Sequence, residues 1–141
     1  PLLALRPGLQ YLGLDASEYA VRRFGRARNI HHARFGDLAM LRPCPPVDLL
    51  VCADVLHYVP DAEFKAGLPG LAELCGGVAF LEAYTAEDVA GDDVQGDFEA
   101  FIARPAKAYR RALEKVGFTF LGQHCWLSPA LSGEVTALER A

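Results

Sequence analysis

Apolar runs of strand length alternate along this chain with segments whose apolar residues recur at helical spacing. Strands are expected at 9–15 (LQYLGLD), 47–53 (VDLLVCA), 77–84 (GVAFLEAY) and 118–124 (FTFLGQH), with a weaker one at 29–35 (NIHHARF). The run 47–53 lacks alternating polar residues, which is typical of a strand with both faces covered. This order of strands and helices predicts an α/β fold with a doubly wound, mostly parallel sheet.

Three helices are predicted between these strands, because apolar residues recur there every three or four positions. Ser17 can cap the first, since its hydroxyl can accept a hydrogen bond from the first turn. Pro69 and Gly70 predict a kink in the second. Pro105 suits the first turn of the third helix and Gly117 suits its end. The apolar faces consist of Ala20, Val21 and Phe24; Phe64, Leu68, Leu71, Ala72 and Cys75; and Tyr109, Ala112, Leu113 and Val116.

The last third of the chain is less regular. Segment 85–104 is acidic and contains glycine, so we expect an irregular connection with one helical turn at 97–103 (DFEAFIA). Residues 133–140 (GEVTALER) are expected to form a last strand, paired antiparallel with 118–124 across the loop 125–132. No internal repeat is visible, and residues 1–141 are expected to form a single domain.

The composition is that of a folded protein with excess negative charge. Hydrophobic residues make up 52% and charged residues 23% of the chain, as in globular proteins with a sizeable core. With 14 basic and 18 acidic residues, the net charge of −4 argues against nucleic acid and anionic membranes as partners. No apolar stretch approaches the ~20 residues that a bilayer span requires. Arginines cluster at 22–28, where a solvated helix face is expected.

The cysteines predict neither a metal site nor disulfides. Cys44, Cys52, Cys75 and Cys125 never approach the C-x-x-C spacing of zinc ligands. Three of them lie in apolar surroundings, where a free cysteine behaves as a small hydrophobe. We therefore expect a reduced, cytoplasmic protein without a bound metal.

Polar residues follow three of the predicted strands. Ligands of open parallel sheets bind at the carboxyl ends of the strands, where Asp15, the turn 36–38 and the segment 53–58 would lie. Asp15 is suited to accept hydrogen bonds from ribose hydroxyls. Asp37 could accept one from the exocyclic amine of an adenine, with Leu38 packed on the ring. Either aspartate could instead cap the helix that follows it.

In this order the stretches resemble the class I S-adenosylmethionine-dependent methyltransferases, a family with a seven-stranded Rossmann-like fold. The matching stretches are YLGLDASEYAV, FGDL, VDLLVCADVLHYVPD, GGVAFLEAY and YRRALEKVGFTFLG, which together span nearly the whole chain. The resemblance implies S-adenosylmethionine as cofactor and a small molecule as methyl acceptor. The cofactor-binding residues that it implies are Asp15, Ala16, Gly36, Asp37, Leu38, Ala53 and Asp54.

The segment after strand 47–53 would then face the acceptor. His57 is the candidate catalytic base, because an imidazole titrates near neutral pH, although a histidine hydrogen-bonded at a helix start is at least as plausible. Tyr58 would face the acceptor. Tyr84, Tyr109 and Trp126 could form an apolar lid over it, or they could belong to the core.

One part of the family pattern has no match in this sequence. Family members begin with a strand and a glycine-rich loop, D/E-x-G-x-G-x-G, whereas residues 1–8 (PLLALRPG) resemble the end of the helix after that loop. In the family's strand order, 3-2-1-4-5-7-6, the absent strand is the central one. Buried unpaired backbone groups cost about 1–3 kcal/mol each, so we expect an N-terminal segment to be missing or to be supplied by another chain.

Other interpretations were weighed against this one. A signalling receiver domain also has a parallel sheet, but it requires a lysine that AFLEAYTAED does not offer. A nicotinamide-dependent enzyme needs the same absent glycine fingerprint. The main alternative is a catalytically silent, methyltransferase-like binding module, which the absent loop favours and Asp15 and Asp37 oppose. Homodimerisation is left open.

Overall fold

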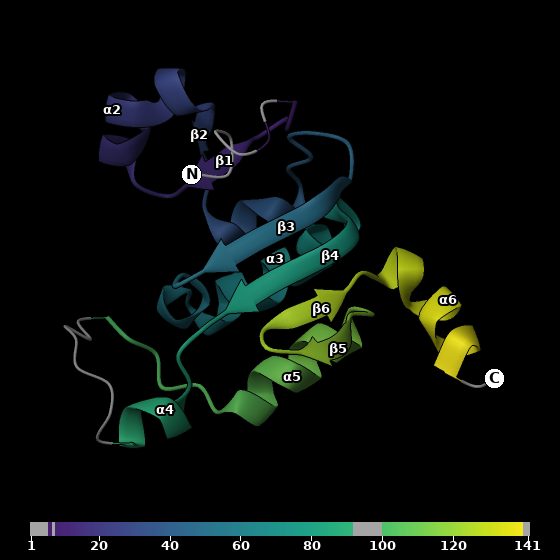
Figure 1. The fold of residues 1–141 in the computed structure, drawn as a ribbon. Helices are drawn as coiled ribbons and strands as arrows, with labels where there is room; N and C mark the ends of the chain where they lie inside the picture. The colour runs from purple at the N-terminus through teal and green to yellow at the C-terminus, as the bar shows by residue number, and fades with distance from the viewer. Residues whose placement is uncertain (1–5, 7, 92–99, 140–141) are drawn as a thin grey trace. The chain divides into compact units, whose positions relative to one another are not determined.

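The computed structural model describes residues 6, 8–91 and 100–139 (Figure 1). The chain forms two compact units, Pro1–Phe35 and Gly36–Ala141. The prediction of a single domain that is incomplete at its N-terminus stays a prediction.

The first unit is a strand–helix–strand motif. It contains β1 (Gly13–Asp15), α2 (Glu18–Arg28) and β2 (Ile30–His32), and the two strands pair in parallel. Ser17 caps α2 as predicted, because its Oγ accepts the backbone N–H of Ala20 over 3.2 Å. Both strands are shorter than predicted, since the parallel ladder has only three residues on each side.

The second unit is built on a four-stranded sheet in the order β3-β4-β6-β5. The long strands β3 (Val47–Ala53) and β4 (Cys75–Glu82) are parallel, while β6 (Cys125–Leu127) lies antiparallel between β4 and β5 (Thr119–Gly122). The predicted α/β class, with parallel pairs and a C-terminal antiparallel hairpin, is confirmed. The orders β2-β1 and β3-β4-β6-β5 correspond to 3-2 and 4-5-7-6 of the family's arrangement.

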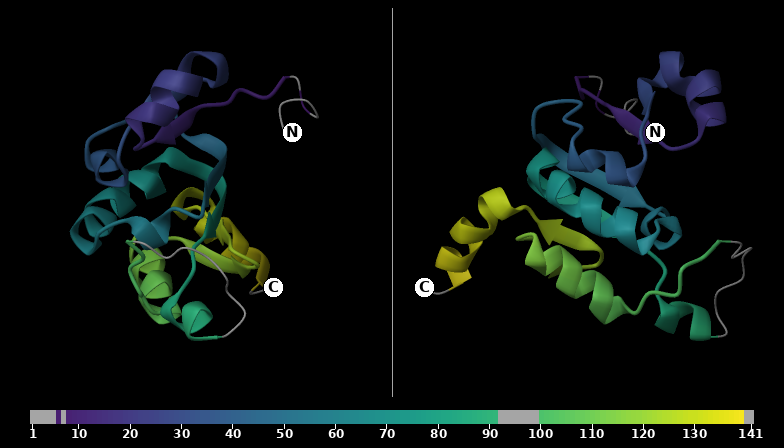
Figure 2. Two further views of the ribbon diagram at one scale, coloured as in Figure 1. Left: turned by 90° about the vertical axis from the view of Figure 1, so that its left-hand side faces the viewer. Right: turned by 180° about the vertical axis from the view of Figure 1, so that it is seen from behind.

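Two helices cover one face of this sheet. Helices α3 (Asp61–Leu74) and α5 (Ala106–Lys115) lie on the same side of it (Figure 2), and Phe64 of α3 meets Tyr109 of α5 edge to face, with ring centroids 5.6 Å apart. Pro69 lies inside α3. Cys75, predicted on the face of this helix, is instead the first residue of β4. Gly117 follows α5 with φ +97°, the left-handed conformation that suits glycine.

β3 does not have both faces covered, which corrects the expectation from its unbroken apolar sequence. The side chains of Leu49 and Val51 are 54% and 58% exposed. In the part of the chain that the structure describes, β3 pairs only with β4. Helix α3 lies along the opposite face of β3 and β4 (Figure 1), and the alternate residues Leu49, Val51 and Ala53 of β3 remain exposed.

The connection after β4 contains a short helix, α4 (Ala86–Ala90), which was not predicted. It begins with a capping box, because Thr85 and Asp88 exchange hydrogen bonds between side chain and backbone. Of the helical turn predicted at 97–103, residues 97–99 lie outside the described residues and 100–103 are not helical. Ile102 instead donates its backbone N–H to the carbonyl of His57 over 2.9 Å.

The C-terminal hairpin exists, but its second strand was wrongly predicted. Gln123 and His124 both have positive φ, 46° and 63°. They form a two-residue turn that connects β5 directly to the antiparallel strand β6. The pairing strand is therefore β6, within the segment predicted as a loop. Residues 133–139 of the predicted strand GEVTALER belong to α6 (Pro129–Glu139), which starts with the favoured proline at its first position.

Candidate active site

The carboxyl end of β3 has an unusual backbone. β3 ends at the exposed Ala53, and Asp54 follows with φ 59°. A non-glycine residue in this left-handed region is uncommon, although aspartate tolerates it better than most, and such residues concentrate at functional sites. The Asp54 side chain is 66% exposed, and its Oδ1 lies 3.2 Å from Nε2 of His57. The sequence therefore places a carboxylate at the rim where a ligand of a parallel sheet would bind.

His57 lies beneath this rim in the short helix η2 (Leu56–Tyr58) and is fully buried. Its Nδ1 accepts the backbone N–H of Tyr84 over 3.2 Å. Burial lowers the pKa of His57, while the negative charges of Asp54 and Glu82 oppose that shift. With Nδ1 occupied as an acceptor, the neutral ring carries its proton on Nε2.

This geometry bears on the predicted role of His57 as a base. Neutral His57 has no free lone pair, because one nitrogen accepts from Tyr84 and the other carries the proton. Nε2 is near Asp54, but in the described part of the chain it has no well-aligned hydrogen-bond partner. Catalysis by His57 stays a prediction, and the contacts favour the alternative of a hydrogen-bonded histidine at a helix start.

The turn expected to hold adenine is docked on α3. It forms η1 (Phe35–Ala39), and Gly36 donates its backbone N–H to Oε1 of Glu63 in the first turn of α3, over 3.2 Å. Farther along α3, the absence of a side chain at Gly70 allows close approach: a Cβ there would lie 1.7 Å from the carbonyl oxygen of Leu38. Because α3 starts just beyond the carboxyl end of β3, Gly36 lies at the same end of the unit as Asp54.

An open hollow of about 420 Å³ lies against this turn, lined by Gly36, Asp37, Met40 and Leu41. Leu38, predicted to pack on the adenine ring, is instead only 5% exposed and belongs to the core. Met40 is 91% exposed, and together with Leu41 it supplies the apolar surface of the hollow. Met40 was not predicted from the sequence, although a large apolar residue two positions after FGDL and just before a proline-rich turn was a usable signal.

Asp15 follows β1 in the first unit. Its Oδ1 accepts the backbone N–H of Ser17 over 2.7 Å, so one oxygen supports the turn into α2, as the capping alternative requires. Ala16 is exposed, and its carbonyl lies 3.2 Å from Nε2 of His32. Binding of ribose by Asp15 and of the cofactor by Ala16 stays a prediction.

The four predicted substrate-binding aromatic residues fall into two groups. Tyr58 and Tyr84 are 40% and 42% exposed, and their rings flank the His57 ring at centroid distances of 4.2 and 5.4 Å. Tyr109 and Trp126 are 6% and 5% exposed, which matches the core alternative and leaves them no surface for a lid. Substrate binding by the first pair stays a prediction.

Arg104 was not singled out from the sequence. It is 6% exposed. Its guanidinium donates hydrogen bonds to oxygen atoms around η2, two of them to Oδ1 of Asp61, and it packs on the rings of Phe64 and Tyr109. These hydrogen bonds hold the pKa of the Asp61 carboxyl below its usual range. A lone arginine after an acidic segment gives no sequence signal of burial, because Asp61, Leu56 and Val59, which accept most of its hydrogen bonds, are more than 40 residues away.

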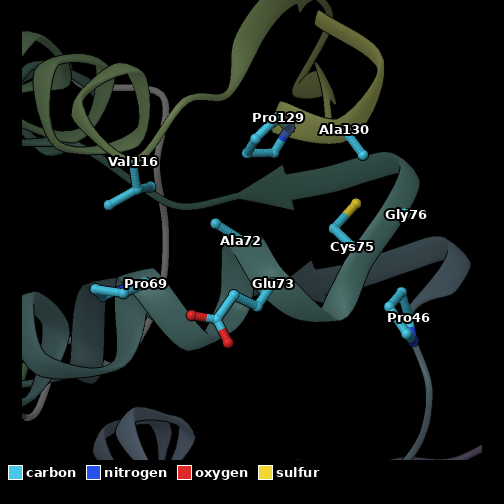
Figure 3. A pocket seen from close by; sticks show the side chains of 9 residues that line it. All are labelled: Pro46, Pro69, Ala72, Glu73, Cys75, Gly76, Val116, Pro129 and Ala130. Atoms are coloured by element: carbon cyan, nitrogen blue, oxygen red, sulfur yellow. The ribbon is translucent and has the colours of Figure 1, made fainter.

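A second pocket lies at the opposite strand ends. It has a volume of about 420 Å³ and is lined by Pro46, Pro69, Ala72, Glu73, Cys75, Gly76, Val116, Pro129 and Ala130 (Figure 3). Pro46 and Cys75 mark the amino ends of β3 and β4, so the pocket is separate from the carboxyl-end rim. Burial raises the pKa of the Cys75 thiol, and burial likewise raises that of Cys52 to about 11. These thiols are therefore protonated and unreactive at neutral pH.

Metal-binding clusters and membrane-spanning helices are both absent from the described residues. Among them, no group of three or more histidine, cysteine, aspartate or glutamate side chains is arranged to hold a metal ion. None of the helices in the described part of the chain combines the length and apolar character needed to cross a membrane.

No protein-family model and no curated protein matches the sequence. Solved structures do match. NodS from Bradyrhizobium japonicum WM9, an N-methyltransferase in complex with S-adenosyl-L-homocysteine, is 18% identical over 91% of this chain and 71% of its own, with a TM-score of 0.59. Human N-acetylserotonin methyltransferase in complex with SAM is 21% identical over 89% of this chain and 41% of its own, with a TM-score of 0.55.

A third structure, from work on the conversion of a disulfide bond into a thioacetal group during echinomycin biosynthesis, is 18% identical over 99% of this chain and 75% of its own, with a TM-score of 0.60. The YcgJ protein of Bacillus matches over 84% of this chain but only 56% of its own. The chain thus spans part of the length of its structural neighbours. At these identities the likeness shows the fold: the chain has the class I methyltransferase fold.

Proposed function

We propose that this protein transfers a methyl group from S-adenosylmethionine to a small-molecule acceptor. One observation carries the proposal: on a fold shared with methyltransferases solved with SAM or its product, the exposed acids Asp37 and Asp54 lie at the carboxyl-end rim of the second unit. Ligands of such sheets bind at this rim.

The residues of the second unit fit the adenosyl part of the cofactor. The hollow at Gly36–Leu41 combines the Asp37 carboxylate with the apolar surface of Met40 and Leu41, and a flat, partly polar base needs both. Asp37 would accept from the adenine amine. In the first unit, the oxygen of Asp15 that does not bond Ser17 would accept from the ribose.

Ala53 and Asp54 would line the methionine part. When bound, the cofactor supplies an electrophilic methyl group on a sulfonium sulfur. The exposed carboxylate of Asp54 would favour the positive charge at that end of the ligand. The buried His57 would hold Asp54 from below, and Tyr58 and Tyr84 would exclude water from one side of the acceptor. Positioning and desolvation then provide the rate, which suits an in-line displacement from an activated donor.

Titration calorimetry of the full-length protein with S-adenosylhomocysteine tests the proposal. We expect saturable binding, weakened about tenfold or more by Asp37→Asn, because a hydrogen bond to a charged group contributes about 1.5–3 kcal/mol. The matched control is Asp48→Asn, an exposed aspartate near the amino end of β3. No heat at ~1 mM ligand, where the binding free energy would be weaker than about −4 kcal/mol, would favour a catalytically silent module instead.

A further inference from the structure

We propose that Arg104 is a positioning residue of this site, which holds the turn Leu56–Val59 so that His57 and Asp54 keep their places at the end of β3. The inference rests on the proposed function for the meaning of the site, but the contacts that carry it belong to the second unit alone.

The guanidinium of Arg104 has all five of its N–H groups engaged. Nε and one Nη2 hydrogen are donated to Oδ1 of Asp61, and the other Nη2 hydrogen to the carbonyl of Val59 over 2.9 Å. Nη1 donates to the carbonyl of Leu56 over 3.1 Å and to Oη of Tyr109 over 2.9 Å. Five donors in a fixed fork are the full capacity of an arginine side chain.

The faces of the guanidinium are covered as well. Its central carbon lies 4.6 Å from the ring centroid of Phe64 and 4.9 Å from that of Tyr109. A buried charge is costly unless it is paired and hydrogen-bonded, and here Asp61 supplies the counter-charge. Arg104 therefore ties three segments together: the turn after β3, the first turns of α3 and the first turns of α5.

These hydrogen bonds hold the turn Leu56–Val59, which carries His57 of the candidate site. The carbonyls of Leu56 and Val59, which Arg104 binds, bracket His57 and Tyr58. Two residues before Arg104, Ile102 donates to the carbonyl of His57 over 2.9 Å. Residues 100–105, the green segment that leads into α5 (Figure 1), thus hold both ends and the middle of this turn.

The same segment also places an aromatic ring beside His57. Phe101 precedes Ile102 in the chain, and its ring centroid lies 5.6 Å from that of His57. A loosened turn would expose His57 and release Asp54 from its left-handed conformation. Small displacements of groups around a reacting centre reduce rates steeply, so we expect the loss of these contacts to affect the site as well as stability.

The test compares Arg104→Lys with wild type in the full-length protein. Lysine keeps the charge near Asp61 but lacks the planar fork, so it cannot reach two carbonyls, a carboxylate and a hydroxyl together. The control is Arg110→Lys, an arginine of α5 whose guanidinium packs on the exposed Phe120 ring instead, 4.4 Å from its centroid. Two quantities are measured: the pKa of His57 by NMR of its ring nitrogens, and the affinity for S-adenosylhomocysteine.

In Arg104→Lys we expect the pKa of His57 to rise toward its usual range, because the ring becomes hydrated, and the affinity to fall about tenfold. Arg110→Lys should change neither. A purely structural role would lower the melting temperature and leave the titration of His57 in the folded protein unchanged, and that result overturns the proposal.

Two further arms keep the test decisive. If Arg104→Lys does not fold, Asp61→Asn, which changes an exposed carboxylate, should shift the His57 titration in the same direction, and an unshifted titration contradicts the inference. If wild type itself binds no S-adenosylhomocysteine, the proposed function fails. The His57 titration then still decides whether Arg104 holds the turn.

Discussion

The backbone N–H of Tyr84 donates to Nδ1 of His57 over 3.2 Å, and this bond joins the ends of the two parallel strands β3 and β4. It fixes the imidazole as a neutral ring with its proton on Nε2. The residue that sequence alone suggests as a base therefore lies buried beneath the rim, with its Nε2 3.2 Å from Oδ1 of Asp54.

Folding stability should depend on the protonation of His57. Its pKa is lowered in the folded state by burial, so the unfolded chain binds the proton more readily. Its contribution is present above the unfolded pKa of about 6.5 and is lost as the pH falls through that value toward the lowered folded one. Urea unfolding of wild type and His57→Gln between pH 8 and 5 measures this, and the wild type should lose more stability. Parallel curves for the two proteins would contradict it.

Asp54 should tolerate asparagine better than alanine. Its φ of 59° costs a residue such as alanine about 1–2 kcal/mol, whereas asparagine adopts the left-handed region readily. We expect Asp54→Ala to be about 1 kcal/mol less stable than Asp54→Asn in urea. Both variants should lower the pKa of His57 further, because the Asp54 charge raises it. Equal stability of the two would show that the left-handed backbone is not retained in solution.

Gly70 should be indispensable for the docking of η1 on α3. An alanine Cβ would lie 1.7 Å from the Leu38 carbonyl oxygen, so the turn must move. Gly70→Ala should cost about 3 kcal/mol or more, at the upper end of overpacking effects, and weaken S-adenosylhomocysteine binding. Gly133→Ala is the matched control, since nothing lies within 4 Å of a Cβ there. It should stabilise α6 by about 0.5–1 kcal/mol.

Truncation to alanine should lower the free energy of unfolding far more at Trp126 than at Tyr84. Trp126 is buried, with its ring 4.8 Å from that of Phe120, and Trp126→Ala should cost about 3–5 kcal/mol. Tyr84→Ala removes an exposed ring but keeps the backbone bond to His57, so the free energy of unfolding should change by less than about 1 kcal/mol. Chemical denaturation separates them, and a small effect at Trp126 would revive its role in a lid.

Local chemistry explains what the sequence could predict. The cap at Ser17, the span Val47–Ala53 and the end of the helix at Gly117 all follow from signals within a few residues. The hairpin partner could not be recognised, because Gln123 and His124 are not typical of a left-handed turn.

The site was predicted less completely, because burial depends on distant contacts. Asp37 and Asp54 were predicted as cofactor-binding residues from their places after strands, and that role stays a prediction. The burial of Leu38 against α3 and four of the five hydrogen bonds of Arg104 arise from residues far apart in the chain. No local pattern encodes them.

The central claim is that the carboxyl ends of the strands hold the cofactor. It is tested most directly by backbone NMR of the full-length protein during titration with S-adenosylhomocysteine. The account predicts that shift changes concentrate at Asp15–Ala16, Gly36–Leu41 and Ala53–Tyr58. Changes confined to the pocket around Pro46, Cys75 and Pro129 at the opposite strand ends, or no changes at all, would contradict it.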